Sequence, residues 1–289
     1  MQSSGYKSDA LLLITAGIWG LAFVAQRVGM QHVEPFIFNG VRFALGALSL
    51  VPIMMFKVFP ASPDIKPTRA TILKGSLAAG LALFLGVSLQ QVGIVTTTAG
   101  KAGFITGLYV VLVPIMSLVW GQHVRHGTWF GALCAAAGLY LLSIKAGFSI
   151  ERGDFLVLLS ALCWAAHVHI IGRFASRIDA LRLAFHQYLI CAALSLVVAA
   201  IFEHPTLDGL VGATVPIIYG GVFSVGIAYT LQVAAQKKAH PAHAAIILSL
   251  ESVFAALGGW LILSEALSLR ALIGCALMLT GMIISQLKS

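Results

Sequence analysis

Long apolar stretches separated by short polar connections make up almost the whole chain. Ten of them are about 20 residues long, the length that a helix needs to cross roughly 30 Å of hydrocarbon. Strands of a membrane β-barrel would alternate apolar and polar residues over about ten positions, and these stretches do not. The pattern predicts an all-α integral membrane protein with ten transmembrane helices, at residues 10–28, 35–56, 71–92, 99–120, 128–144, 154–173, 180–201, 214–234, 241–263 and 268–286.

The first predicted helix recurs as the sixth. Asp9 precedes Trp19 by ten positions, Asp154 precedes Trp164 by ten positions, and the two pairs are 145 positions apart. Further matches at offsets of 142 to 146 are Leu89-Gln90 with Leu231-Gln232, the set Gln122, Gly131 and Gly138 with Glu265, Gly274 and Gly281, and, more weakly, residues 47–51 with 193–197. The chain is therefore an internal duplication.

Each copy holds five helices, and because five is an odd number the second copy must enter the membrane from the opposite side. The sequence thus predicts two inverted five-helix repeats, residues 1–148 and 149–289. Inverted repeats are the architecture of secondary transporters, because two antiparallel halves can exchange roles and open a central site to either side. A transporter is the leading functional prediction.

Composition agrees with a membrane solvent. Of the 289 residues, 59% are hydrophobic and 10% are charged, whereas about a quarter of a soluble domain is charged. The net charge of +8 is spread through the loops and forms no basic stripe, which argues against nucleic acid as a partner.

The loop cations follow the positive-inside rule when the N-terminus is placed inside. The predicted cytoplasmic side holds Lys7, Lys57, Lys66, Arg69, Lys74, Arg125, Arg173, Arg177, Arg182, Lys237, Lys238 and Lys288, against Arg27, Lys101, Lys145, Arg152 and Arg270 on the other side. We therefore expect a multi-pass protein of the cell (inner) membrane with both termini in the cytoplasm. Its first helix is expected to persist and not to be cleaved as a signal peptide, because it has an internal copy.

Several landmarks carry a family resemblance. They are Trp19 and Trp164, residues 97–100 (TTAG), residues 250–257 (LESVFAAL), residues 258–265 (GGWLILSE) and Gly274. On these residues the chain resembles the EamA type of the drug/metabolite transporter superfamily over essentially its whole length. The resemblance implies transport across the cytoplasmic membrane, most often export of metabolites or amino acids. Ser252 departs from the pattern, since such proteins commonly carry Pro there, and this puts a helix kink at that point in doubt.

Two charged residues lie inside predicted spans. Glu251 is ten residues after Pro241, hence roughly 15 Å into the bilayer, where a charge costs at least about 2.5 kcal/mol. It is expected to face the bundle interior, either to bind substrate or a proton, or as a protonated acid bonded between helices. Arg42 is a candidate for binding a substrate carboxylate, with a structural ion pair or an interfacial position as alternatives. The sequence leaves open whether Arg42 and Glu251 pair.

Uncharged polar and aromatic residues complete the candidate site. Trp164 and His167 share a helix face, and Trp19 is the counterpart of Trp164 in the first repeat. Opposed aromatic walls would form a cavity for planar or apolar substrates, although plain packing would use the same residues. The other candidates for substrate binding or coupling are Gln90, Tyr109 and Gln187, for which hydrogen bonding between helices is the alternative.

Neither a metal nor a cofactor is expected. His167 and His169 point roughly 200° apart on a helix, so they cannot bind one metal ion together. The cysteines lie singly inside predicted spans and are interpreted as packing residues: Cys134, Cys163, Cys191 and Cys275.

The leading hypothesis is a secondary transporter that moves small organic solutes, amino acids or related metabolites, outward by alternating access. The sequence has no phosphate-binding loop and no soluble domain, so a proton or solute gradient would supply the energy. A membrane enzyme is one alternative, but no H-E-x-x-H, G-x-S-x-G or paired acids are present. A non-transporting scaffold or sensor is the other. The expected partners are a small-molecule substrate and the lipid bilayer, and a homodimer is one option for the assembly.

Overall fold

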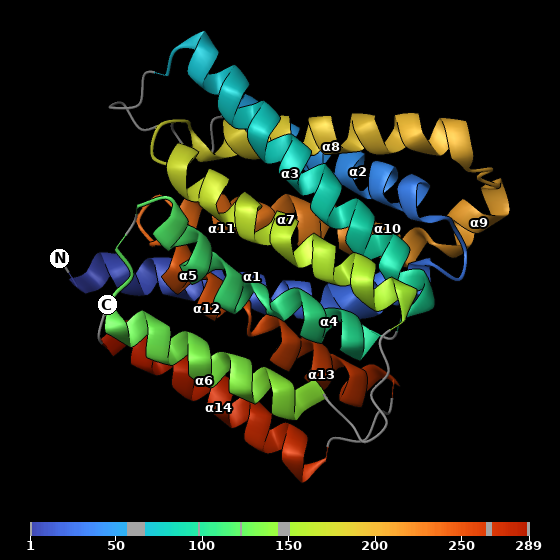
Figure 1. The fold of residues 1–289 in the computed structure, drawn as a ribbon. Coiled ribbons are helices and arrows are strands. Elements are labelled where there is room, and N and C mark those ends of the chain that lie inside the picture. The colour runs from blue at the N-terminus through green and yellow to red at the C-terminus, as the bar shows by residue number, and fades with distance from the viewer. Residues whose placement is uncertain are drawn as a thin grey trace.

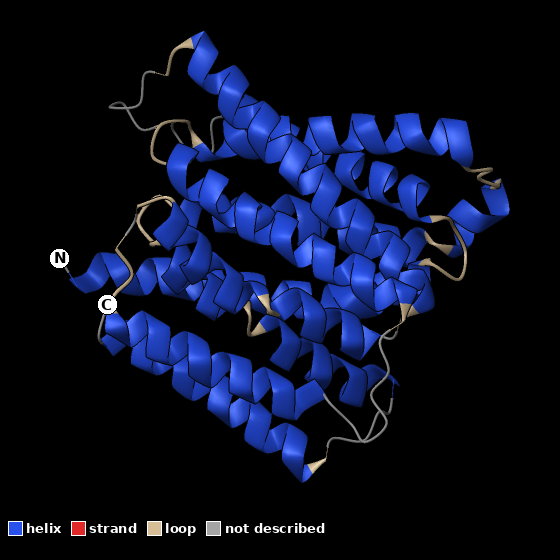
Figure 2. Cartoon of the chain, in the orientation of Figure 1, coloured by secondary structure: helices blue, strands red, loops and turns tan. Residues whose placement is uncertain are grey.

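The structure of the chain, a computed structural model, describes residues 2–56, 67–97, 99–121, 123–143, 151–263 and 268–287. These segments are helices joined by short connections, and no strand occurs among them (Figures 1 and 2). The helices are α1 (Gln2–Gly29), α2 (Pro35–Met55), α3 (Arg69–Thr96), α4 (Ala99–Gly107), α5 (Tyr109–Val119), α6 (His126–Ser143), α7 (Arg152–Phe174), α8 (Ala180–Phe202), α9 (Leu207–Gly212), α10 (Thr214–Ile218), η1 (Tyr219–Tyr229), α11 (Thr230–Ala235), α12 (Pro241–Leu248), α13 (Glu251–Leu263) and α14 (Leu269–Leu287).

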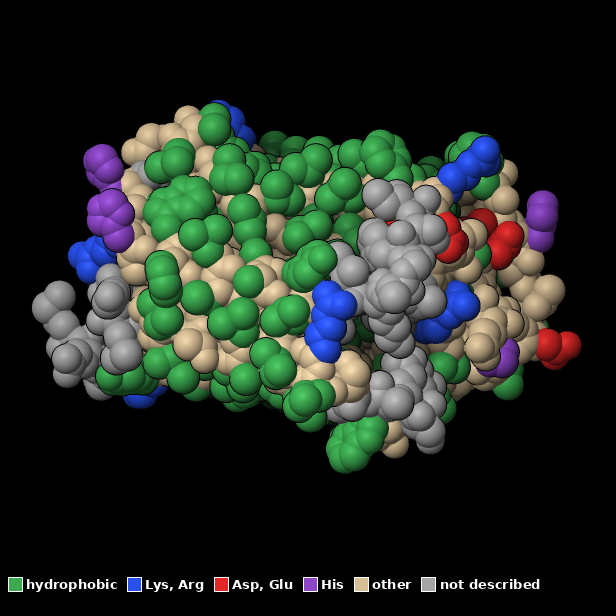
Figure 3. Space-filling view, turned by 60° about the horizontal axis from the view of Figure 1, so that its bottom comes forward, with side chains coloured by type: hydrophobic (Ala, Val, Ile, Leu, Met, Phe, Trp, Pro, Cys, Tyr) green, Lys and Arg blue, Asp and Glu red, His purple; other side chains and the backbone are tan. Residues whose placement is uncertain are grey.

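The ten predicted spans are present. Eight helical segments of the described chain are long and apolar enough to cross a membrane, α14 is a shorter apolar helix, and α6 packs along α14. Hydrophobic side chains cover the broad middle of the surface in Figure 3, and most of the charged and histidine side chains in that view lie toward its two ends. The prediction of an all-α, ten-helix membrane protein is confirmed. The side of the membrane on which the termini lie stays a prediction.

Three spans are not the continuous helices that the sequence predicts. The fourth is divided at Leu108 and the ninth between Leu248 and Glu251, and the eighth runs through α10, the π-helix η1 and α11. At both breaks the chain tightens to bonds between residues three apart: the Leu108 amide donates to the Ile105 carbonyl at 3.2 Å, and the Leu250 amide donates to the Ile247 carbonyl at 3.1 Å. Another unpredicted element is the short helix α9.

The ninth span breaks before Glu251 although residue 252 is a serine and not the proline that similar proteins commonly carry there. Ser252 has a backbone amide and so continues the tight turn, donating to the Ser249 carbonyl at 3.1 Å. Its hydroxyl donates to the Gly103 carbonyl of α4 at 2.9 Å. The ninth span is therefore interrupted without a proline, and a serine tethers the interruption to the fourth span.

The two halves run in opposite directions. Near the end of α1, the Arg27 guanidinium donates to the Ile94 carbonyl of α3 at 2.9 Å, and the start of α7 packs at the same end, where Gly153 meets Gly93. The start of α1 and the end of α7 instead meet the start of α12. Figure 1 accordingly shows α1 and α7 antiparallel, with the start of α1 and the end of α14 at one end of the bundle, hereafter the terminal end. The predicted repeat boundary, between residues 148 and 149, lies outside the described residues.

Glycines seven residues apart let α6 and α14 pack closely. A Cβ atom on Gly138 would lie 2.5 Å from the Gly274 carbonyl oxygen, and one on Gly131 would lie 2.6 Å from the Gly281 carbonyl oxygen. In a bilayer, where lipid competes for apolar surface, such close approach is a main source of helix association. The pair forms the lowest layer in Figure 1.

Candidate functional site

A cavity of about 40 Å³ lies between the two halves; it has room for a few water molecules and is smaller than a typical small-molecule site. Both repeats contribute to its wall. The lining residues are Trp19, Ala22, Phe23, Gln26, Arg42, Gln90, Thr106, Tyr109, Trp164, Val168, Ser224, Tyr229, Gln232, Leu248 and Glu251. Six of the eight residues nominated from the sequence are among them: Trp19, Arg42, Gln90, Tyr109, Trp164 and Glu251.

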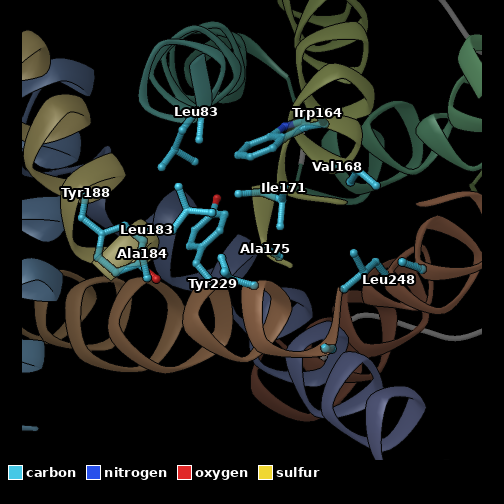
Figure 4. Close-up of a cluster of buried hydrophobic side chains, with 14 of the residues drawn as sticks. Leu83, Trp164, Val168, Ile171, Ala175, Leu183, Ala184, Tyr188, Tyr229 and Leu248 are labelled. Atoms are coloured by element: carbon cyan, nitrogen blue, oxygen red, sulfur yellow. The ribbon is translucent and has the colours of Figure 1, made fainter. Parts of the chain in front are cut away.

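Three aromatic rings form one wall of this cavity. The centroid of the Tyr229 ring lies 4.5 Å from that of Trp19 and 6.1 Å from that of Trp164, with which it is stacked. Figure 4 shows Trp164 of α7 and Tyr229 of η1 near each other in the buried cluster. The two repeat-related tryptophans therefore flank a tyrosine that the sequence analysis missed. The only feature of the sequence that could have indicated Tyr229 is that it is a polar aromatic residue in the middle of a predicted span.

Hydrogen bonds fix the orientation of both tryptophan rings. The Trp164 indole nitrogen donates to Gln90 Oε1 at 2.8 Å, and the Gln90 amide donates to Gln26 Oε1 at 3.2 Å. The Trp19 indole nitrogen donates to the Ser224 carbonyl at 3.2 Å. Both ring faces are thus held toward the cavity without loss of the indole hydrogen bond.

The π-helix η1 places the Ser224 carbonyl within reach of the Trp19 indole. A π-helix bonds residues five apart, so its carbonyls are displaced from ordinary helix positions and other groups can reach them. Thr15 of α1 uses a second one, its hydroxyl donating to the Ala228 carbonyl at 3.2 Å. The equivalent span of the first repeat, α3, is an uninterrupted α-helix. This local asymmetry brings Ser224 and Tyr229 to the cavity.

Two half-helices begin at the cavity. Tyr109 is the first residue of α5 and Glu251 the first residue of α13, and they lie 142 positions apart, the same offset that relates Gln90 to Gln232. Tight turns keep the first amides of both half-helices paired: the Val111 amide donates to the Leu108 carbonyl at 3.0 Å, and the Ser252 amide donates to the Ser249 carbonyl at 3.1 Å. The repeat symmetry therefore brings two such helix ends to one site.

Glu251 and Tyr109 are buried but incompletely satisfied. Glu251 is 4% exposed, and its carboxyl interacts with the Tyr109 phenol. Among the described residues, however, neither the Tyr109 hydroxyl nor Glu251 Oε1 has a partner in hydrogen-bond geometry, and Gln232 Oε1 has none either. Buried polar atoms without partners are costly, so these three point to a guest that supplies the missing bonds.

Arg42 lies in the cavity wall without an ion pair to Glu251. Its Nε donates to Asn39 Oδ1 at 3.0 Å, and its guanidinium carbon lies 5.3 Å and 5.1 Å from the ring centroids of Phe38 and Phe43. Cation–π contacts of this kind partly offset the cost of burying the charge. Arg42 makes no other hydrogen bond among the described residues, so its remaining guanidinium donors can serve an anionic group in the cavity.

His167 and Gln187, the other two nominated residues, lie behind the cavity wall. The His167 Nε2 and Gln187 Oε1 atoms are 2.9 Å apart, and both side chains are fully buried. The His167 ring meets the Trp164 and Tyr229 rings edge-on. His169 faces elsewhere, with Nε2 3.0 Å from the Val113 carbonyl, in agreement with the opposed directions expected for the two histidines.

Comparison with known proteins assigns the chain. The sequence profile of the EamA-like transporter family matches residues 7–144 and again residues 151–286, one match in each half. The chain belongs to this family. The EamA resemblance of its sequence landmarks is thereby confirmed, and membership indicates a transporter and not an enzyme.

Relatives match this EamA-like chain over nearly its full length. An "Uncharacterized transporter" of Archaeoglobus fulgidus is 33% identical over 282 residues, which cover 97% of this chain and 86% of that protein. The "Uncharacterized transporter YoaV" of Bacillus subtilis is 25% identical over 91% of each chain. A protein of known crystal structure shares the fold with a TM-score of 0.79 at 20% identity, covering 97% of this chain and 96% of that one.

Proposed function

We propose that this protein is a secondary transporter that carries amino acids or related small metabolites out of the cell by alternating access. The central observation is one buried cavity, lined by both inverted halves, in which Tyr109 and Glu251 begin two repeat-related half-helices. Transporters of this architecture bind solutes where broken helices of the two repeats meet.

The distribution of polar groups in the cavity supports a zwitterionic solute. Glu251, Tyr109 and Gln232 offer unpaired acceptor atoms, which suit an ammonium group. Arg42 offers donors that suit a carboxylate. Tyr229 lies near both Arg42 and Glu251. A planar or apolar side chain of the solute would then pack against the tryptophan rings.

Two aspartates at opposite ends of the bundle suggest how access alternates. At the terminal end, Asp9 Oδ1 lies 2.9 Å from His243 Nε2, so the first helix of one half holds the start of α12 in the other. At the opposite end, the Thr97 hydroxyl, just before α4, donates to Asp154, the repeat counterpart of Asp9. We term these contacts the Asp9 clasp and the Asp154 clasp. In the proposed cycle one opens while the other stays closed.

Glu251 is the proposed coupling residue, because a carboxyl in the cavity can exchange a proton for the solute's ammonium group. The test is uptake of radiolabelled amino acids into proteoliposomes driven by an imposed pH gradient. We expect Glu251→Gln to abolish pH-driven flux and the exposed, distant Asp208→Asn control to leave it unchanged. Intact pH-driven flux in Glu251→Gln would refute the coupling, and absence of flux for every amino acid and metabolite with the unmodified protein would refute the substrate class.

A further inference from the structure

A second pocket lies on the outer surface of the bundle, in a groove between α3 and α8. It shares no lining residue with the central cavity. Leu73, Leu77 and Leu189 line it, and their side chains are exposed. Because these leucines belong to spans with an apolar exterior, the bilayer is the medium that fills the groove.

Two residues that line this groove carry a polar atom with no hydrogen-bond partner among the described residues. Ser76 is 4% exposed, and its hydroxyl oxygen has no hydrogen-bond partner among the described residues. The Nδ1 atom of His186, which also lines the groove, is buried and unpartnered in the same way. Unsatisfied polar groups at this depth cost several kcal/mol each in hydrocarbon, so both call for an external partner.

A cation lies at the mouth of the groove. Arg69 begins α3, is exposed and lines the pocket, and Ser76 follows roughly 10 Å deeper along the helix. The headgroup layer is about 5–8 Å thick on each side of the hydrocarbon, so Arg69 lies at headgroup level when Ser76 lies near the start of the acyl chains. Asp179 is close in sequence to this end of α8, but its carboxylate caps α8 through two backbone amides. Exposed cations near the same end are Lys74, Arg173, Arg177 and Arg182.

We propose that this groove is a binding site for an anionic phospholipid. The phosphate pairs with the Arg69 guanidinium, the glycerol ester carbonyls accept hydrogen bonds from the Ser76 hydroxyl and the His186 ring, and an acyl chain lies along the exposed leucines. Basic pockets between transmembrane helices bind anionic headgroups by this combination of charge and depth. The proposal does not depend on what the central cavity transports.

Native mass spectrometry of the delipidated full-length protein, titrated with phosphatidylglycerol or phosphatidylcholine of identical chains, tests this site. The dissociation constant for phosphatidylglycerol is expected to rise about fivefold in Arg69→Gln, the effect of one basic side chain near a membrane surface. Lys74→Gln is the matched control: the residue is exposed on the same helix near the same end but does not line the groove. We expect it to change the constant less than about twofold.

The deeper contacts are tested by Ser76→Ala combined with His186→Phe, with thermal unfolding confirming that the variant is folded. This variant is expected to bind both lipids more weakly while keeping the preference for phosphatidylglycerol. Equal affinity of the unmodified protein for the two lipids would overturn the proposal, because acyl chains alone would then fill the groove. Equal losses in Arg69→Gln and Lys74→Gln would also overturn it, since they would indicate diffuse attraction and no defined site.

Discussion

The Asp9 clasp offers a quantitative test of alternating access. Asp9 and His243 are joined at 2.9 Å with side chains only 16% and 10% exposed, and the other ring nitrogen of His243 lies 2.9 Å from Ser285 Oγ. The histidine is therefore held between α1 and α14. A hydrogen bond to a charged group contributes about 1.5–3 kcal/mol and a neutral one about 0.5–1.5 kcal/mol. Asp9→Asn should weaken the closed terminal end by about 1.4 kcal/mol, which shifts the open population about tenfold.

Accessibility of the cavity measures that shift. Ala22 lines the cavity and is buried, so a cysteine at this position, in a background without the native cysteines, reports access to it. A membrane-impermeant maleimide added from the terminal end should label this cysteine about tenfold faster in Asp9→Asn than in its parent. Asp154→Asn should instead speed labelling from the opposite end, because the equivalent clasp lies there.

Asp208→Asn, on the exposed surface of α9, is the control for the loss of one carboxylate. Unchanged labelling from both sides in Asp9→Asn would refute the reasoning, as would faster labelling from both sides at once. The first result would mean that the clasp does not hold the end closed, and the second that the bundle has loosened as a whole.

Two further predictions concern stability. Gly138→Ala should lower the unfolding free energy in detergent by about 1–3 kcal/mol, because its Cβ would lie 2.5 Å from the Gly274 carbonyl oxygen. The control Gly103→Ala, whose Cβ would have no neighbour closer than 3.9 Å, should be neutral or stabilising. Equal effects of the two substitutions would contradict the packing argument. Desolvation lowers the pKa of His240, whose Nδ1 accepts a hydrogen bond from the Ala242 amide and caps α12. Protons therefore bind the unfolded chain more strongly, and stability should fall as the pH drops below about 6.5. A His240→Asn variant, which keeps a cap but does not titrate, should show a weaker pH dependence of the unfolding free energy, and an identical pH profile would refute the assignment.

The position of Glu251 shows how far sequence reasoning reached into the site. A lone acid near the middle of an apolar span has to face the interior, and Glu251 does line the cavity. Trp19 and Trp164 were found through the duplication, and both line the same cavity. His167 shares the Trp164 side of its helix, as expected, yet it bonds to Gln187 behind the wall. Helix periodicity predicts the direction of a side chain, but the neighbouring helix decides whether that side chain faces a cavity or a hydrogen-bond partner.

Other features of the site had no clear signal in the sequence. Leu108 and Leu250, where two spans tighten, are ordinary helix formers, and neither adjoins a proline. Tyr229 and Ser224 reach the cavity because they lie in the π-helix η1, and the equivalent span of the first repeat, α3, contains no π-helix. Gln26 lies near the end of a predicted span, and only the structure shows that it accepts a hydrogen bond from Gln90. The contacts that bring Ser224, Tyr229 and Gln26 to the cavity join residues far apart in the chain.

What the sequence by itself determined is the number of spans, their helical nature and the inversion of the two halves. Hydrocarbon forces each crossing segment to satisfy its own backbone, so length and apolarity suffice to identify helices, and an odd number of helices in each copy determines the inversion. Tertiary structure alone decided which polar groups meet, which helices break, and which atoms are left unpaired around the cavity. Those outcomes depend on packing between helices distant in sequence, and hydropathy carries no information about such pairings.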